Sequence, residues 1–261
     1  MIEPEGHEPV CRRRLSTAAV APLPPAQPPA RAALVGRTVR LEPLDPDQHG
    51  PDLFRAGHGP GQAERWRFMA YGPFADQDAM QAWLQPLAGT AEPMFFAICD
   101  PAGRALGMAS YLNIHPAGGS IEIGHVWFGS ELRRRTAATE AIHLLIRHAV
   151  ALGFRRIEWK CDAANLPSRR AALRFGFRHE GIFYRHLVVK GRNRDTAWYS
   201  ILAEEWPALD AAFTAWLDPR NFGPDGRQHR PLMARQPLVP EAARAMAGRS
   251  DDQCRMSGRH S

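Results

Sequence analysis

The strongest constraint on the fold comes from one stretch near the middle of the chain. Residues 121–128 (IEIGHVWF) are rich in β-branched and aromatic side chains and are closed by a Gly-Ser pair, which predicts a strand. From residue 137 to 152 the apolar side chains recur at helical spacings, and a glycine follows where a helix C-cap belongs. A strand therefore leads into a helix through a turn that contains Arg133, Arg134 and Arg135.

The three arginines stand where they do not help the helix. A helix N-terminus already carries about half a positive charge, so cations there are mildly unfavourable. They make sense if an anion binds among the free backbone N–H groups of the first turn, because helix starts bind phosphate readily. Taken alone, however, a short arginine run is more often a solvated surface than a binding site. The stretch raises the hypothesis of a phosphate-bearing ligand, which other segments must support.

Length and composition narrow the class of protein. The chain has 261 residues, 44% of them hydrophobic, which is enough for one substantial core and at most two. No apolar run approaches the ~20 residues that a membrane span needs, and we expect no signal peptide. The cysteines show no paired spacing, which fits reduced thiols and a cytoplasmic location. They are Cys11, Cys99, Cys161 and Cys254.

The basic charge of the chain is concentrated at its ends. The formal net charge is +6, but residues 41–217 are balanced, and the excess lies in residues 1–40 and 218–261. A nucleic-acid-binding domain usually carries its basic residues on a folded face. The distribution therefore argues against nucleic acid as a partner.

The chain divides into a central domain and two tails. Residues 1–34 are rich in proline and poor in large apolar residues, which predicts a disordered arm. Residues 218–261 are rich in Pro, Gly and Arg and predict an extended or disordered basic tail. Within the domain, residues 35–217, we expect strands at 38–44, 94–99, 105–114, 121–128, 156–162, 179–190 and 194–202, and helices from 46, at 76–87, 137–152, 165–175 and 203–217.

This order of elements predicts an α/β (α+β) fold. A run of antiparallel strands passes into one βαβ crossover, which gives a mixed, mostly antiparallel sheet with helices on both faces. Ligands favour the crevice at the carboxyl ends of strands where the connections diverge. Three features converge there: the arginine turn, the ionisable Glu122 on an otherwise apolar strand, and Asn165 and Ser168 at the start of the next helix.

Several motifs, taken together and in order, are shared with a known family. They are IEIGHVWF (121–128), RRRTAATEA (133–141), NLPS (165–168), RFGF (174–177), HEGIF (179–183) and GRNRDTAW (191–198). With them the chain resembles the GNAT superfamily of acyl-CoA-dependent N-acyltransferases, in the RimJ/RimL-type branch typified by the ribosomal-protein alanine N-acetyltransferases. The resemblance covers about residues 35–217. It implies a GNAT-like sheet with a βαβ acyl-CoA site and acetyl-CoA as cosubstrate.

The resemblance also implies a set of coenzyme-binding residues. The loop would hold the pyrophosphate, the central strand would pair with the pantetheine arm, and the next helix would approach the sulfur. The residues are, in that order, Arg133, Arg134, Arg135, Thr136, Ala137 and Ala138; Val126, Trp127 and Phe128; Asn165 and Ser168. Two positions depart from the family pattern. Thr136 stands where glycine is usual and could instead be an N-cap, and Ala172 stands where many members have a tyrosine acid.

The implied reaction is direct attack of an amine on the thioester. The amine must be neutral when it attacks, and Glu122 matches the strand glutamate of this branch as its base. Ser168 matches a serine that can protonate the leaving thiolate. Each has a structural alternative: Glu122 as a strand residue paired with an arginine, and Ser168 as a first-turn serine bonded to helix amides. No metal is implied, and no His/Cys/Asp spacing matches a metal site.

The acceptor amine is left open by the sequence. A protein N-terminal α-amino group and a small-molecule amine are both candidates, and residues 57–75 and 183–198 are expected to select between them. A homodimer is compatible with the resemblance, and a membrane partner is not expected. The departures at Thr136 and Ala172 keep a second hypothesis, a catalytically weak acyl-CoA-binding or regulatory module.

Overall fold

The computed structural model describes Arg13 and residues 24–232. Its strands are β1 (Leu34–Val35), β2 (Arg40–Pro43), β3 (Met94–Cys99), β4 (Ala105–His115), β5 (Ser120–Phe128), β6 (Arg156–Asp162), β7 (Arg178–Val189) and β8 (Arg192–Leu202). Its helices are α1 (Pro46–Gly57), α2 (Gln62–Trp66), α3 (Gln77–Leu84), α4 (Thr136–Ala151), α5 (Leu166–Arg174) and α6 (Trp206–Leu217), with 3-10 turns η1 (Gln85–Leu87), η2 (Ala203–Glu205) and η3 (Pro219–Asn221).

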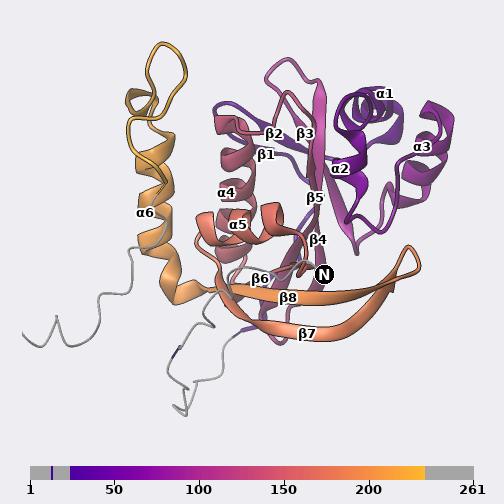
Figure 1. The fold of residues 1–261 in the computed structure, drawn as a ribbon. Coiled ribbons are helices and arrows are strands. Elements are labelled where there is room, and N and C mark those ends of the chain that lie inside the picture. Colours follow the sequence, from indigo (N-terminus) through magenta and orange to yellow (C-terminus); the bar gives the residue numbers. More distant parts are fainter. Residues whose placement is uncertain (1–12, 14–23, 233–261) are drawn as a thin grey trace, which may run out of the picture.

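In this part of the chain the strands form one eight-stranded sheet in the order β1-β2-β3-β4-β5-β6-β8-β7. Figure 1 shows α1, α2 and α3 on one side of the sheet and α4, α5 and α6 on the other. Each side has its own apolar core, because side chains alternate between the faces of a strand. The predicted mixed, mostly antiparallel sheet with helices on both faces is confirmed.

The helices begin where short polar residues and prolines allow. Asp45 caps α1, and its carboxylate accepts hydrogen bonds from the backbone N–H groups of Asp47 and Gln48 at 3.0 and 3.2 Å. Pro46 follows at the first helical position, where its missing N–H costs no hydrogen bond. Asn165 caps α5 by accepting from the Ser168 backbone N–H, and Pro167 is the second residue of that helix.

The sheet opens at its centre, between β5 and β6. These two strands are parallel and pair only from Ser120 to Glu122, opposite residues 156–158. Beyond Glu122, β5 carries a bulge against β4, where the register shifts and His125 adopts a φ of 51°. A bulge bends its strand, so β5 turns away from β6. The crossover between the two strands is α4, whose start therefore lies beside this opening.

The sequence did not predict β1 or α2. β1 has only two residues, and α2 has five and starts after Gly61 in the left-handed conformation. Elements this short leave no periodic pattern. The aromatic stretch after α2 has no period for a different reason: Trp66 is fully buried and its ring lies 5.2 Å from that of Trp127 on β5, so tertiary packing places it.

Residues 24–34, from the arm predicted to be disordered, and residues 218–232, from the tail predicted to be extended or disordered, make defined contacts in the structure. The backbone N–H of Ala26 donates to the carbonyl of Pro116 at 3.1 Å, and that of Gln27 donates to Leu152 at 2.8 Å. After α6 the chain forms η3 and a β-bridge between Phe222 and Gln228. Backbone hydrogen bonds and a few buried side chains hold these segments in place. Because they have no periodic apolar face, their amino-acid composition does not predict this order. The rest of both predicted tails lies outside the described residues.

Candidate active site

The turn between β5 and α4 places three arginines at a helix start, and no ion pair joins them to another described residue. α4 begins at Thr136, with Arg135 as its N-cap in an extended conformation and without a side-chain hydrogen bond to the first-turn amides. Thr136 is therefore the first helical residue, and the alternative that made it the N-cap is wrong. Arg134 adopts a φ of 60°, which turns the loop sharply before the helix. The uncapped amides and the arginines together favour an anion.

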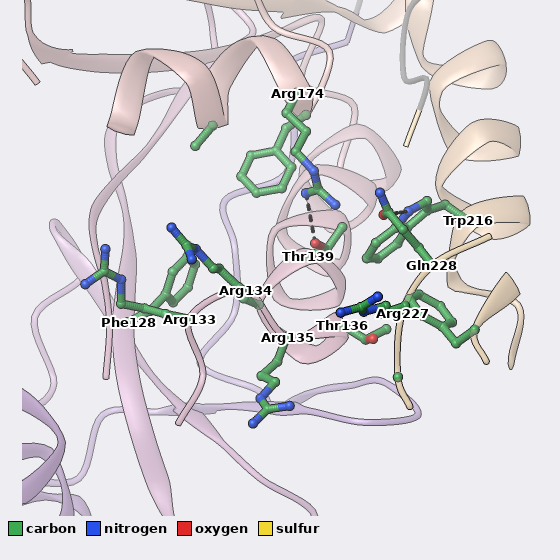
Figure 2. Close-up of a pocket in the computed structure, with 15 residues that line it drawn as sticks. Phe128, Arg133, Arg134, Arg135, Thr136, Thr139, Arg174, Trp216, Arg227 and Gln228 are labelled. Atoms are coloured by element: carbon green, nitrogen blue, oxygen red, sulfur yellow. Dashed lines mark hydrogen bonds between the residues drawn. The ribbon is translucent and has the colours of Figure 1, made fainter. Parts of the chain in front are cut away.

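A cavity of about 790 Å³ lies against this turn (Figure 2). Its described lining includes five arginines and no aspartate or glutamate. All five arginines are exposed, and cations gathered in a concave site without carboxylates create a positive field that favours an anionic ligand. The lining residues are Phe128, Arg133, Arg134, Arg135, Thr136, Ala138, Thr139, Ala171, Arg174, Phe175, Trp216, Phe222, Gly226, Arg227 and Gln228.

The positive field reaches beyond the cavity. Arg65 donates from Nε to the carbonyl oxygen of Phe128 at 3.2 Å, at the end of β5. Its pKa is lowered by burial and by the neighbouring charge of Arg133. The positive charge of Arg133 therefore lowers the pKa of a neighbouring arginine, as expected when no carboxylate lies nearby to offset that charge.

Arg174 is one of two arginines in this set that the sequence did not single out, the other being Arg227. It comes from the last turn of α5, and Nη1 donates to Oγ1 of Thr139 at 3.0 Å. Its guanidinium carbon lies 4.8 Å from the ring centroid of Trp216 on α6. Burial of part of the side chain lowers its pKa, although Arg174 as a whole remains exposed. The only sequence signal was its position in the RFGF motif, because Thr139 and Trp216 meet it only in the fold.

A second, smaller cavity of about 160 Å³ brings together the other predicted residues. Val126, Glu122, Asn165 and Ser168 all line it, although they come from β5 and α5. Two predicted coenzyme residues face elsewhere: Trp127 packs its ring against Trp66 in the core on the other face, and Ala137 packs against the core under α4. Their side chains therefore line neither cavity.

Glu122 is held firmly at the closed end of the opening. It is only 6% exposed, and its Oε2 accepts from Asn113 Nδ2 at 2.6 Å and lies 2.9 Å from Lys160 Nζ. The predicted alternative, pairing with an arginine, is wrong, because the cation is a lysine on the neighbouring strand β6. Both contacts use Oε2, and within the described chain Oε1 has no hydrogen bond. The free oxygen belongs to a carboxylate that lines the cavity.

Ser168 does not bond to the helix amides. Asn165 takes that role, since its Oδ1 accepts from the Ser168 backbone N–H at 3.2 Å. The Ser168 hydroxyl instead accepts from Trp159 Nε1 at 3.0 Å, which leaves its own proton free to point elsewhere. One neighbour is Cys161, whose thiol pKa is raised to about 11 by burial, while a hydrogen bond with Ser168 opposes this rise. The structural alternative, in which the Ser168 hydroxyl bonds to the helix amides, is therefore not supported.

Tyr71 is a residue of this cavity that sequence reasoning missed. Its hydroxyl is buried and has no hydrogen-bond partner among the described residues, and burial raises its pKa. The ring stacks on Trp83 at 4.1 Å and on His125 at 5.7 Å. Burial also lowers the pKa of His125 to about 4, so this imidazole is neutral at pH 7. A buried unpaired hydroxyl is costly unless a ligand bonds to it.

The two segments expected to select the acceptor meet at this cavity. Lys190, at the tip of the β7–β8 hairpin, donates from Nζ to the carbonyl oxygens of Trp66, Tyr71 and Gly72 at 2.9, 3.2 and 2.5 Å. The hairpin therefore fastens the loop that carries Tyr71. Arg194 on β8 lines the same cavity.

A separate group, Glu42, His49 and Cys99, has its ligand-type atoms within 4.8 Å of one another. Nδ1 of His49 accepts from the backbone N–H of Asp45 at 3.0 Å, so Nε2 carries the proton and faces Glu42 Oε2 at 3.3 Å. The pKa of the Cys99 thiol is raised to about 12 by burial and nearby carboxylates. This chemistry is that of a hydrogen-bonded buried histidine, and it disfavours metal ligation.

Comparison with known proteins decides the family. The family described as "Acetyltransferase (GNAT) domain" matches residues 38–178, more than half of the chain. A solved GCN5-related N-acetyltransferase from Brucella melitensis is 46% identical, with 81% of this chain and 96% of that chain covered and a TM-score of 0.79. The chain belongs to the GNAT acetyltransferase family. The resemblance drawn from its motifs is thereby confirmed.

Two further proteins are similar to this chain. A probable acetyltransferase of the GNAT family from Chromobacterium violaceum is 41% identical, with 77% and 100% of the two chains covered and a TM-score of 0.69. A Bacillus subtilis protein named "Putative ribosomal N-acetyltransferase YdaF" is 32% identical over 105 residues, which are 40% of this chain and 57% of that protein. This GNAT protein is an N-acyltransferase of a family that uses acetyl-CoA. Among its described residues, no helix is long and apolar enough to cross a membrane.

Proposed function

We propose that this GNAT protein transfers an acetyl group from acetyl-CoA to a primary amine by direct attack on the thioester. The observation that carries the proposal is the adjacency of two unlike cavities on one strand. Phe128 lines the arginine cavity and Val126 lines the Glu122 cavity, and side chains two residues apart point to the same face.

The coenzyme fits the donor set of the larger cavity. Its volume of about 790 Å³ is in the range of small-molecule and cofactor sites. Arg133, Arg134 and Arg135 would neutralise the pyrophosphate beside the uncapped amides of α4. The pantetheine arm would follow β5 past Phe128 and Val126, where β5 has no partner strand on its β6 side. When bound, acetyl-CoA supplies the acetyl group in activated form as a thioester.

Two side chains of the smaller cavity would then move protons. Glu122 would accept a proton from the amine at its free Oε1, while Lys160 and Asn113 hold Oε2. Ser168 would donate its hydroxyl proton toward the leaving sulfur, because Trp159 already occupies an acceptor position of that hydroxyl. Backbone N–H groups of β5 beyond Glu122 are candidates for stabilising the oxyanion.

The acceptor would enter between the loop of Tyr71 and the β7–β8 hairpin. The Tyr71 hydroxyl and Glu122, which both belong to the lining of the smaller cavity, would contact it there. The name of the YdaF relative and the RimJ/RimL-type motifs support a protein N-terminal α-amino group as the acceptor. A small-molecule amine is the second candidate.

The test is coenzyme A release from acetyl-CoA, followed with a thiol reagent against a panel of peptide N-termini and small amines. We expect release that depends on the amine and saturates with one class of acceptor. Tight binding of acetyl-CoA with no release above hydrolysis for any amine would replace the proposal by a binding or regulatory module.

A further inference from the structure

The segment after α6 forms a wall of the arginine cavity. We define the C-terminal wall as residues 219–230; Phe222, Gly226, Arg227 and Gln228 from it line the cavity. This segment lies beyond the region of the family match, which ends at residue 178.

The C-terminal wall has a defined structure. Asn221 is 9% exposed, donates from Nδ2 to the carbonyl oxygens of Trp216 and Arg230, and accepts at Oδ1 from the Arg230 backbone N–H at 2.9 Å. Trp216 Nε1 donates to Gln228 Oε1 at 2.8 Å, and the ring of Trp216 meets that of Phe222 edge-on at 5.1 Å. These contacts fix the turn that carries Arg227.

Arg227 extends from this turn toward the start of α4. Figure 2 shows it at the opposite end of the cavity from Phe128 and Arg133. Its one acidic neighbour among the described residues is Asp225, at 3.5 Å, and both side chains are largely exposed. Such a pair is weak, so Arg227 is available to an anionic ligand.

The order of groups in the coenzyme decides what Arg227 meets. The thioester must reach Glu122 and Ser168, so the pantetheine leaves the α4 start on the β5 side. The nucleotide end must then leave on the other side, where the C-terminal wall stands. Beyond the pyrophosphate, this end of coenzyme A carries a phosphate monoester of about −1.5 to −2 charges at pH 7.

We infer that the C-terminal wall is a subsite for the adenosine 3′-phosphate of the coenzyme, with Arg227 as the residue that recognises this phosphate monoester. The inference rests on the proposed function, since it assumes that acetyl-CoA occupies the arginine cavity. It makes Arg227 a specificity-determining residue that separates coenzyme A from its dephosphorylated form.

The experiment is calorimetric titration of the full chain with coenzyme A and with 3′-dephospho-coenzyme A. We expect the protein to prefer coenzyme A by roughly tenfold, and Arg227→Ala to abolish this preference while leaving the affinity for dephospho-coenzyme A unchanged. Arg220→Ala is the matched control, because Arg220 is an exposed arginine of the same wall that does not line the cavity. It should keep the full preference.

Three results would overturn the inference. They are an equal affinity of the wild type for the two coenzymes, an equal loss for both in Arg227→Ala, and a preference that survives in Arg227→Ala. Failure of the wild type to bind either coenzyme would instead reject the proposed function on which the inference rests. Circular dichroism of each variant separates these outcomes from misfolding, which we do not expect at a side chain this exposed.

Discussion

The two cavities differ in how their charges are balanced. The larger one gathers five arginines without a carboxylate in its described lining, so its field is left for a ligand to neutralise. In the smaller one, Glu122 is paired with Lys160, Lys160 also lies 2.9 Å from Glu158, and His125 is neutral. A positive field that no carboxylate of the lining offsets attracts a negatively charged coenzyme. Paired and buried charges instead hold one carboxylate in a fixed position, from which it can accept a proton. The difference predicts that mutations in the two places change different kinetic constants.

The largest effect is expected at Glu122. Glu122→Gln keeps the shape and the hydrogen bond to Asn113 but cannot accept a proton, and Lys160 keeps Glu158 as its partner. We expect kcat to fall roughly 10²–10⁴-fold with an almost unchanged coenzyme affinity. Raising the pH should restore part of the rate, because more of the acceptor amine is then already neutral. A variant that turns over at the wild-type rate at neutral pH and saturating amine would remove Glu122 from the mechanism.

The second-largest effect is expected at the arginine turn, where the affinity for the coenzyme should change and kcat should not. The double change Arg134→Glu with Arg135→Glu places negative charge against the pyrophosphate and should weaken coenzyme binding roughly 10²-fold, with kcat at saturation little changed. Arg170→Glu is the control, since Arg170 is an exposed arginine of α5 outside the cavity lining. Equal losses of affinity in the two proteins would mean that the turn acts only through the overall charge.

A third effect concerns stability and the neutral state of His125. Its pKa is lowered to about 4 in the folded protein, against about 6.5 in the unfolded chain, so the unfolded state binds the extra proton between these values. Stability from this residue is fully present above pH 6.5 and is lost as the pH falls toward 4, by about 3 kcal/mol. His125→Asn, which tolerates the left-handed backbone, should flatten this loss in urea titrations between pH 7 and 4. An unchanged pH slope would show that His125 is not buried as described.

The smallest effect is expected at the hairpin tip. Lys190→Ala removes the three hydrogen bonds to the loop of Tyr71 and should raise KM for the acceptor about fivefold, while the coenzyme affinity stays the same. Arg192→Ala, a neighbouring exposed change on β8, is the control. A weaker coenzyme affinity in Lys190→Ala would contradict the separation of the two cavities.

The parts of this site that the sequence predicted are those encoded locally. The arginine turn, Glu122 and the α5 start each stand within a short strand-to-helix pattern, so their elements and motifs can be read from neighbouring residues. Tyr71 and Arg227 cannot be predicted in this way. Tyr71 lies in an aromatic stretch whose packing on β5 sets its place, and Arg227 lies in a tail whose composition predicts disorder. Both depend on contacts between segments far apart in the chain.

The division between the cavities is tested most directly by a crystal structure of this GNAT protein with coenzyme A bound. We predict electron density for the pyrophosphate among Arg133, Arg134 and Arg135 at the start of α4, and for the thiol sulfur in the cavity of Glu122 and Ser168. Phosphates bound elsewhere, or a sulfur that points away from Glu122, would contradict this division.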